Sequence, residues 1–299
     1  MAIVITQVGV ISPFGRGIDP FEQGLANGVC VLSEHPPLQH MDSSLAGLVA
    51  SNKTFRQYLK RRKAAKLMTP AARLAMDAVG QIWDAVGMRL NPVETGLFFS
   101  VGREPPDEGE AEDALIASSI DGTFSEEALA IHGRSLYPPL LPLKTLPNLI
   151  LGHLSIHFGL CGENAAWAGE GIQSFIEGVW SILEGRSTRV LVGAADSLVD
   201  LGQARDLKRL GISASPAEAA VAWLLEEESV ATGPVLARVE WNGIDRKMSE
   251  DSFLQVSKPH TIRSKMGYCG VVEPQLQLLN RVLQGGVSHW HGLMVHSNR

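Results

Sequence analysis

Short apolar runs alternate with longer amphipathic segments along the chain. Residues 2–11 are rich in β-branched side chains and almost continuously apolar, which is typical of a strand covered on both faces. Residues 95–102 and 189–195 have the same character and predict two more buried strands. Residues 217–226 and 234–242 also predict strands, and we expect these two to be antiparallel neighbours.

The segments between these runs predict helices. Residues 70–87 have an apolar face, a proline in the first turn and a glycine at the end. Residues 169–184 carry apolar side chains round most of the circumference, which is typical of a helix buried inside a domain. Residues 20–27 and 271–284 predict two further helices, and residues 293–295 a last strand. Alternating buried strands and helices indicate a layered α/β fold.

Three segments lack a clear period. Residues 54–66 are basic and contain no acidic side chain, so they favour a solvated helix face. Residues 103–114 are acidic, contain two prolines and predict an exposed loop. Residues 134–148 are rich in proline and leucine, and we expect them to be irregular but covered.

Composition narrows the class of protein. The chain has 299 residues, of which 45% are hydrophobic, which is enough for one large domain or two closely packed halves. A net charge of −6 argues against general nucleic-acid binding, because no basic excess is present to neutralise phosphates. The N-terminus lacks a basic leader, and no run of about 18 apolar residues occurs. With three cysteines in no metal-type spacing, we expect a cytoplasmic protein that binds neither membrane nor nucleic acid.

Several segments of the chain carry recognisable sequence motifs. They lie at residues 4–15, 96–102, 146–164, 190–196 and 267–273. The first ends in Ser-Pro-Phe-Gly, and the last reads Gly-x-x-Gly-x-x-Glu. Together they resemble the β-ketoacyl synthases, the condensing enzymes of the thiolase fold. The match covers most of residues 2–245 and then thins.

The resemblance implies a thiolase-like α/β fold with α-β-α-β-α layers, built from two related halves that each hold a five-stranded mixed sheet. We expect residues 1–299 to form one such domain. Residues 1–245 would be the ketosynthase-like half, and residues 246–299 a reduced C-terminal half. Members of this family usually dimerise across strands near the helix that carries the nucleophile.

The resemblance places a missing nucleophile at the start of residues 169–184. Counting back from Gly185, the family's cysteine position is Ala168, followed by Gly169; counting forward from Gly162, it falls near Gly171. Covalent acyl transfer needs a thiolate or an alkoxide there, and an alanine methyl cannot attack a thioester. Cys161 lies on the wrong side of the loop, and we interpret it as an inert side chain.

The family's two catalytic histidines are also missing. One belongs to a His-Gly-Thr-Gly-Thr loop that this sequence lacks. The other position falls on Ser264 or Tyr268, with His260 nearby. The glycine-rich loop that completes the family's oxyanion hole is not recognisable either. We therefore predict the fold without the condensing chemistry, and no cofactor.

Other residues are candidates for binding. Trp167 fills the shortened loop and would plug or shape an acyl tunnel by its volume, with Phe175 and Ser155 as further candidates; core packing is the alternative. A cluster of basic side chains could dock an acidic acyl carrier protein. Its members are Arg56, Lys60, Arg61, Arg62, Lys63 and Lys66. His153 and His157 have a metal-ligand spacing but no evident third ligand, so we predict no metal.

These expectations combine into one leading hypothesis. The chain would be a non-catalytic chain-length factor that pairs with an active ketosynthase in type II polyketide, polyene or fatty-acid-like biosynthesis. One alternative is an acyl-thioester decarboxylase or acyltransferase that uses Ser155, Ser174 or His157. Another is a homodimeric scaffold that binds carrier proteins. Glu273, at the start of the last helix, would be structural and held by backbone amides.

Overall fold

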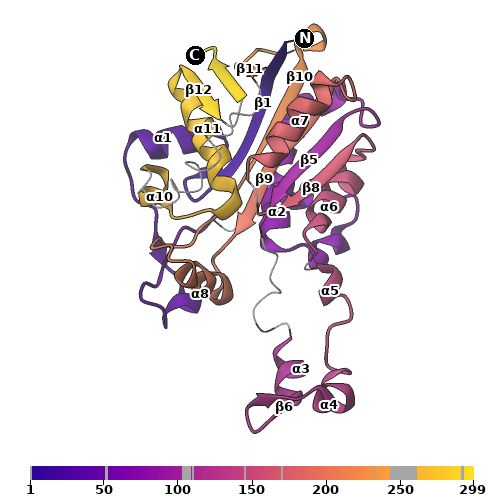
Figure 1. Cartoon of the computed structure of the whole chain (residues 1–299), viewed down its shortest axis with the longest axis vertical. Helices are drawn as coiled ribbons and strands as arrows, with labels where there is room; N and C mark the ends of the chain where they lie inside the picture. Colours follow the sequence, from indigo (N-terminus) through magenta and orange to yellow (C-terminus); the bar gives the residue numbers. More distant parts are fainter. Residues whose placement is uncertain are drawn as a thin grey trace.

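One large mixed sheet runs through the computed structural model of the protein (Figure 1). The structure describes residues 2–50, 53–102, 109, 111–144, 146–169, 171–231, 233–242, 261–290 and 293–299. In the described chain this sheet has the order β12-β13-β11-β1-β10-β9-β5-β8, and β2 pairs with β1. The strands are β1 (Ile3–Ser12), β2 (Gly15–Arg16), β5 (Gly96–Val101), β8 (Asn164–Ala168), β9 (Arg189–Ser197), β10 (Glu218–Glu227), β11 (Ala237–Trp241), β12 (Val287–Trp290) and β13 (Leu293–Ser297).

The predicted strands are confirmed, but one predicted pairing is wrong. β1 lies between β10 and β11 and pairs antiparallel with both, so β10 and β11 are not neighbours. The pattern of apolar residues reports burial and not the partner, and the first strand of the chain takes the place between them. β5 runs parallel to β8 and β9. Residues 164–168, which we expected to be a loop, form the edge strand β8.

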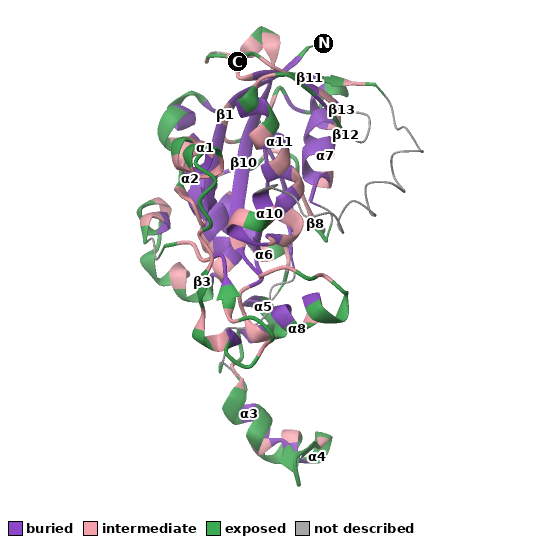
Figure 2. Cartoon of the chain, turned by 90° about the vertical axis from the view of Figure 1, so that its left-hand side faces the viewer, coloured by how far each residue is buried: buried purple, intermediate pink, exposed green. Residues whose placement is uncertain are grey.

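Helices cover both faces of the sheet (Figure 1). They are α1 (Ile18–Ala26), α2 (Pro70–Val86), α6 (Asn148–Phe158), α7 (Gln173–Leu183), α8 (Leu201–Arg209), α10 (Thr261–Met266) and α11 (Glu273–Gln284). Along β10, Val221 and Trp223 enter the core shared with α7 and α11, while Ala220 and Ala222 enter the core shared with α2 and α6. This alternation explains why the strand is apolar throughout, and the buried centre is visible in Figure 2.

The C-terminal part of the chain adds to this sheet instead of building another of similar size. Within the described residues, β11, β12 and β13 extend the large sheet beyond β1, and the other sheets are two-stranded. The side of α11 that faces away from the core carries the polar residues Gln277, Asn280, Arg281 and Gln284. The fold is therefore the predicted thiolase-like α/β class with a strongly shortened second half, in which a helix-sheet-helix arrangement is visible.

An arm leaves the body between β5 and α6 (Figures 1 and 2). We define the arm as residues 111–144. It contains α3 (Glu112–Ala117), β6 (Ser119–Ile120), β7 (Thr123–Phe124), α4 (Glu126–Ala128), the π-helical turn η5 (Leu129–Gly133) and α5 (Leu141–Lys144). Most of the acidic segment predicted as a loop lies outside the described residues, and its end forms α3.

The leucine-rich segment at the end of the arm differs from the prediction. We expected residues 134–148 to be covered, yet Leu136, Leu140 and Leu143 are each at least half exposed. In the described part of the chain, no helix is long and apolar enough to cross a bilayer.

Candidate functional site

The site begins where β8 passes into α7, at a turn that we call the elbow (residues 168–172, of which Glu170 lies outside the described residues). β8 ends at Ala168, and the backbone N–H of Gly169 donates to the carbonyl of Val101 at 3.1 Å. Gly171 packs so closely on the Val271 backbone that a β-carbon would lie 1.9 Å from its carbonyl oxygen. Residues 165–172 contain no thiol, hydroxyl or imidazole. The elbow is thus held by the backbone of Val271, which lies just before α11, and its sequence contains no thiol or hydroxyl.

A buried hydrogen-bond network closes the start of α7. The backbone N–H of Ser174 donates to the Ser100 hydroxyl at 3.2 Å, and the Ser174 hydroxyl donates to the carbonyl of Gly193 at 2.8 Å. The Gln275 amide donates to the Ser174 hydroxyl at 3.0 Å and to the carbonyl of Gly171 at 2.6 Å. Its oxygen accepts from the Trp223 indole at 2.9 Å.

Every side chain in this network is buried in the core. Ser100, Ser174, Trp223 and Gln275 have no exposed surface. A helix start ordinarily leaves unsatisfied N–H groups that can hold an anion, but here protein groups occupy the site. Gln275 is not among the predicted site residues, and its only signal in the sequence is that a polar residue stands among the apolar positions of α11.

Asp196, near the end of β9, holds the loop that contains the Gly-x-x-Gly motif (residues 267–272) against the sheet. This buried carboxylate accepts the backbone N–H of Val271 at 3.2 Å and that of Ser197 at 2.9 Å. Gly270 lies so close that a β-carbon would be 2.0 Å from the carboxylate oxygen. The second glycine of the Gly-x-x-Gly motif is therefore needed so that the loop backbone can approach the Asp196 carboxylate.

Glu273 has a side-chain partner that the sequence did not predict. Its carboxylate forms a two-point pair with Arg263, with a 2.8 Å distance from Nη2 to Oε1 and 3.2 Å from Nε to Oε2. A planar guanidinium matches a carboxylate in this geometry, and burial of both groups makes the pair necessary.

The positions that replace the catalytic histidines have no shared catalytic geometry. Ser264 lies exposed on α10. The Tyr268 ring lies under the Arg263 guanidinium at 4.6 Å, and burial raises the pKa of its hydroxyl. Burial, with the charges of Glu273 and Asp196, raises the pKa of the Cys269 thiol well above its usual value, so the buried thiol stays protonated. His260 lies outside the described residues.

The tunnel candidates lie in different surroundings. Trp167 is partly exposed on the edge strand β8, where its ring packs against Phe98 with 6.1 Å between centroids. Phe175 is fully buried and packs edge-to-face against Trp223 at 5.8 Å. Ser155 is partly exposed on α6. Trp167 is therefore the large aromatic candidate that reaches the surface.

The basic cluster lies on two short 3-10 helices and the link between them. These are η2 (Thr54–Tyr58) and η3 (Arg62–Leu67), so the predicted single helix face is absent from this described segment. All six side chains of the cluster are exposed, and none forms an ion pair with a described carboxylate. The structure thus gathers the six predicted residues on one segment of the surface.

The two histidines of α6 lie beneath this segment. The rings of His153 and His157 stack with 6.1 Å between centroids, and His157 Nδ1 accepts the backbone N–H of Lys60 at 3.1 Å. Burial lowers the pKa of both imidazoles. Groups of three or more metal-ligating side chains are absent from the described residues.

β8 is an edge strand of the large sheet. It pairs with β5 on one side, and in the described chain it has no strand on the other. Its residues are exposed or half-buried. The arm adds apolar surface, since about half of the large apolar side chains that the described chain exposes belong to it. These are Leu115, Ile116, Ile120, Phe124, Ile131, Leu136, Tyr137, Leu140 and Leu143.

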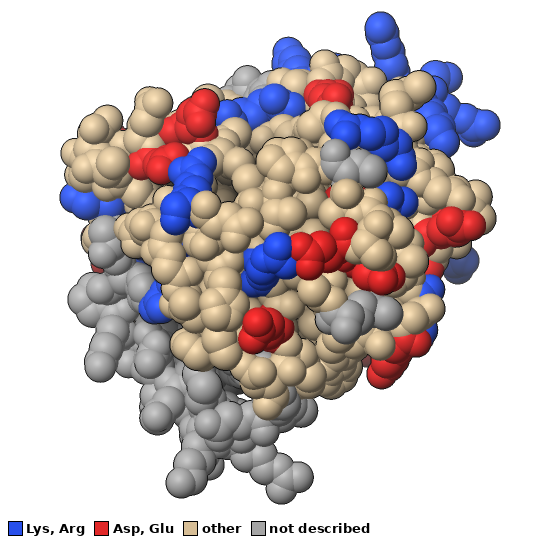
Figure 3. All heavy atoms as spheres, turned by 90° about the horizontal axis from the view of Figure 1, so that it is seen from above, with Lys and Arg blue, Asp and Glu red and all other residues tan. Residues whose placement is uncertain are grey.

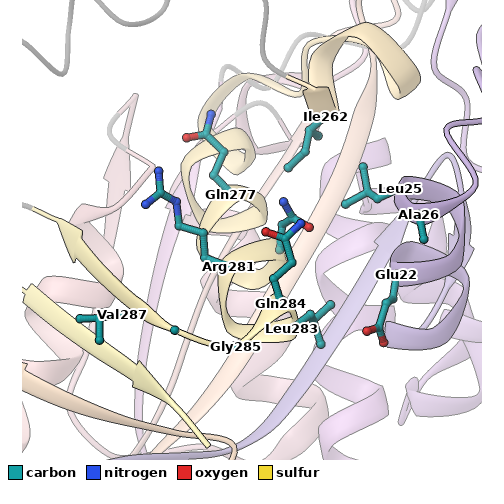
Figure 4. Close-up of a pocket in the computed structure, with 12 residues that line it drawn as sticks. Glu22, Leu25, Ala26, Ile262, Gln277, Arg281, Leu283, Gln284, Gly285 and Val287 are labelled. Carbon is teal, nitrogen blue, oxygen red and sulfur yellow. The ribbon is translucent and has the colours of Figure 1, made fainter. Parts of the chain in front are cut away.

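One pocket between described residues lies away from the elbow. It has a volume of about 600 Å³ between α1 and α11, with Leu25 and Leu283 on its apolar side and Gln277, Arg281 and Gln284 on its polar side (Figure 4). None of the elbow residues lines it. Charges of both signs are interspersed over the end of the molecule that carries the termini (Figure 3), so this end is not a charged docking face.

The comparisons with known proteins agree with this architecture. The sequence model of the β-ketoacyl synthase N-terminal domain matches residues 1–223. This match covers most of the chain, and the protein therefore belongs to the β-ketoacyl synthase family. No curated protein matches the sequence significantly.

Solved structures resemble most or nearly all of the chain. The ishigamide ketosynthase/chain length factor has a TM-score of 0.64 at 17% identity, covering 99% of this chain and 98% of that one. A second structure contains a type II polyketide synthase acyl-carrier protein in complex with its ketosynthase bound to the hexaketide. Its TM-score is 0.63 at 17% identity, and the match covers 84% of this chain and 72% of that one. A β-ketoacyl synthase from Burkholderia phymatum has a TM-score of 0.59 at 16% identity, and the match covers 82% of this chain and 64% of that one. At these identities the likeness shows the fold.

Proposed function

We propose that this chain is a non-catalytic, ketosynthase-like subunit that associates with an active ketosynthase and shapes the tunnel in which the partner's acyl chain grows. The observation that carries the proposal is the closed elbow. The place where the family needs a thiol holds Ala168 and Gly169, and the Gln275 network fills the helix start behind them. A chain without a nucleophile can still act through shape and association.

The unpaired edge of β8 supports association. An edge strand presents free backbone N–H and C=O groups that another strand can pair with. The exposed apolar side chains of the arm need a cover, because monomeric proteins rarely expose so many together. A ketosynthase of the same fold could supply both a strand for β8 and a surface for the arm.

Trp167 supports the tunnel role. Its ring projects from the strand whose outer edge would meet the partner, and it is only partly covered by Phe98. A large aromatic ring at such a boundary would limit the length of an acyl chain by its volume. Ser155 and Phe175 are secondary candidates, since one is a small polar group and the other lies in the core.

The basic cluster supports contact with an acidic acyl carrier protein. Its six exposed cations have no described carboxylate partner, so they are available to steer an anionic partner. The similarity to a structure that contains an acyl-carrier protein and its ketosynthase favours the same reading.

The alternative activities have weaker support. Ser174 would need to face substrate, yet its side chain is fully buried and hydrogen-bonded at both ends. His157 is buried, and its Nδ1 already accepts a backbone N–H. Ser155 is partly exposed but has no described base beside it. An independent decarboxylase or acyltransferase therefore lacks an assembled site among the described residues.

Co-expression with an active ketosynthase tests the proposal. We expect a stable heterodimer, and we expect Trp167→Ala to shift the product toward longer chains. Trp241→Ala is a matched control, because this half-buried tryptophan projects from the inner strand β11, away from the edge strand β8, and packs edge-to-face on Trp180. An isolated homodimer that turns over acyl thioesters by itself would contradict the proposal.

A further inference from the structure

A second cavity lies beside the basic cluster, on other residues than the elbow and the proposed tunnel. It has a volume of about 330 Å³ and is formed where η2 and the first turns of α2 meet the end of β1 and the start of β10. Its polar lining includes Lys53, Arg56 and Arg73, and its apolar lining includes Ile11, Phe55 and Leu74. The cavity is thus cationic on one part of its wall and apolar on another.

Arg73 is the unusual member of this set. Its side chain is half-buried on α2, and it forms no ion pair with a described carboxylate. Lys53 and Arg56 are exposed and have no such pair either. Because Lys53, Arg56 and Arg73 line one cavity, their positive charges favour the binding of an anion there.

The carboxylates of the cavity wall are already committed elsewhere. The Asp77 carboxylate binds the Arg16 guanidinium at 2.7 Å. The Glu218 carboxylate accepts the backbone N–H of Val49 at 3.0 Å and the hydroxyl of Ser197 at 3.0 Å. Burial raises the pKa of Glu218, against a smaller opposing effect of His35 and Arg73. The cavity therefore keeps an excess of positive charge.

We propose that this cavity binds an anionic amphiphile, with its carboxylate or phosphate head on Lys53, Arg56 and Arg73 and a short apolar body on Ile11, Phe55 and Leu74. The volume lies at the small end of the range for ligand pockets, which suits a short chain better than a bulky ligand. The charged head gives orientation, and the apolar wall gives most of the burial. This site uses neither the elbow nor β8, and it shares with the proposed carrier-protein surface only Arg56, so the variants below are made at Arg73 and Lys53.

Calorimetric titration of the full chain at pH 7.5 tests the site with defined probes. We expect octanoate and octyl phosphate to bind, while 1-octanol and inorganic phosphate bind at least about ten-fold more weakly, because each lacks one half of the interaction. Tighter binding of octyl phosphate than of octanoate would identify a phosphate as the natural head, and the reverse order a carboxylate. Either order supports an anionic amphiphile.

Variants locate the binding. Arg73→Gln and Lys53→Gln should each raise the Kd for octanoate about ten-fold, since each removes one charge-assisted contact. Arg73→Lys should keep part of the affinity, and circular dichroism reports whether each variant is folded. Arg209→Gln, on exposed α8, is the matched control and should leave the Kd unchanged.

Two results would overturn the inference. One is equal affinity for octanoate and 1-octanol, which would make the charged wall irrelevant. The other is an unchanged Kd in folded Arg73→Gln, which would place the ligand elsewhere. Neither result bears on pairing with a ketosynthase, which is measured by co-expression.

Discussion

The elbow and the outer edge of β8 lie next to each other in the chain and have opposite character. At the elbow, the amide of Gln275 and the hydroxyl of Ser174 are buried and satisfied by other protein groups. At β8, in the described chain, the strand has a partner on one side only and its residues are partly exposed. Polar groups at the elbow are therefore satisfied within the core, whereas the backbone at the outer edge of β8 has no strand partner among the described residues.

The largest expected effect is a loss of stability when the buried hydrogen-bond network at the elbow is broken. Gln275→Leu leaves the Trp223 indole and the Gly171 carbonyl without their buried partner, and we expect a loss of about 3 kcal/mol in the free energy of unfolding. Urea unfolding followed by tryptophan fluorescence measures it. Gln284→Leu, on the exposed side of the same helix, should change this value by less than about 0.5 kcal/mol. Equal effects of the two variants would mean that the network does not stabilise the elbow.

Charged substitutions on the exposed apolar surface of the arm should weaken association with the partner without unfolding the chain. Phe124→Asp combined with Ile131→Asp introduces charges on the exposed arm, and we expect the affinity for the ketosynthase partner to fall about 100-fold. Size-exclusion chromatography and titration calorimetry measure it. Met88→Asp is the control, because Met88 is fully exposed on the body. Unchanged affinity in the arm variant would show that the arm is not part of the interface.

Acid should affect the surface segment through the histidines beneath it. Burial lowers the pKa of His153 and His157, so the unfolded chain binds protons more readily than the folded one. Their contribution to stability is therefore complete above pH 6.5, the ordinary histidine value, and is lost as the pH falls through the lowered values.

Urea midpoints between pH 7.5 and pH 5 measure this effect. His157→Gln should flatten the decline, whereas His132→Gln, on the exposed arm, should leave it as it is. A decline that is the same in both variants would assign the acid sensitivity to other groups.

The smallest expected effect is that of restoring the thiol. Ala168→Cys adds a reactive group at the elbow, but the positions of the two histidines remain Ser264 or Tyr268 and an absent loop. Because Cys30 and Cys161 are already exposed, we expect the variant to label at one thiol more than the wild type, with no condensation above the wild-type background. Measurable condensation by the variant alone would show that the rest of the catalytic machinery is present after all.

The sequence was sufficient wherever a property depends on local composition. The continuous apolar runs of β1, β5 and β9 and the amphipathic period of α2 predicted these elements near their observed bounds, because burial leaves a periodic trace. The loss of the nucleophile is also a sequence property, since no arrangement of the chain can give Ala168 a thiol.

Only the tertiary structure decided which distant groups meet. The place of β1 between β10 and β11, the pairing of Glu273 with Arg263, and the network around Gln275 join residues far apart in sequence or on different elements. Local pattern indicates whether a residue is buried, but strand order and side-chain partners follow from the packing of the whole core. For the same reason, the sequence alone did not show that Lys53, Arg56 and Arg73 line one cavity.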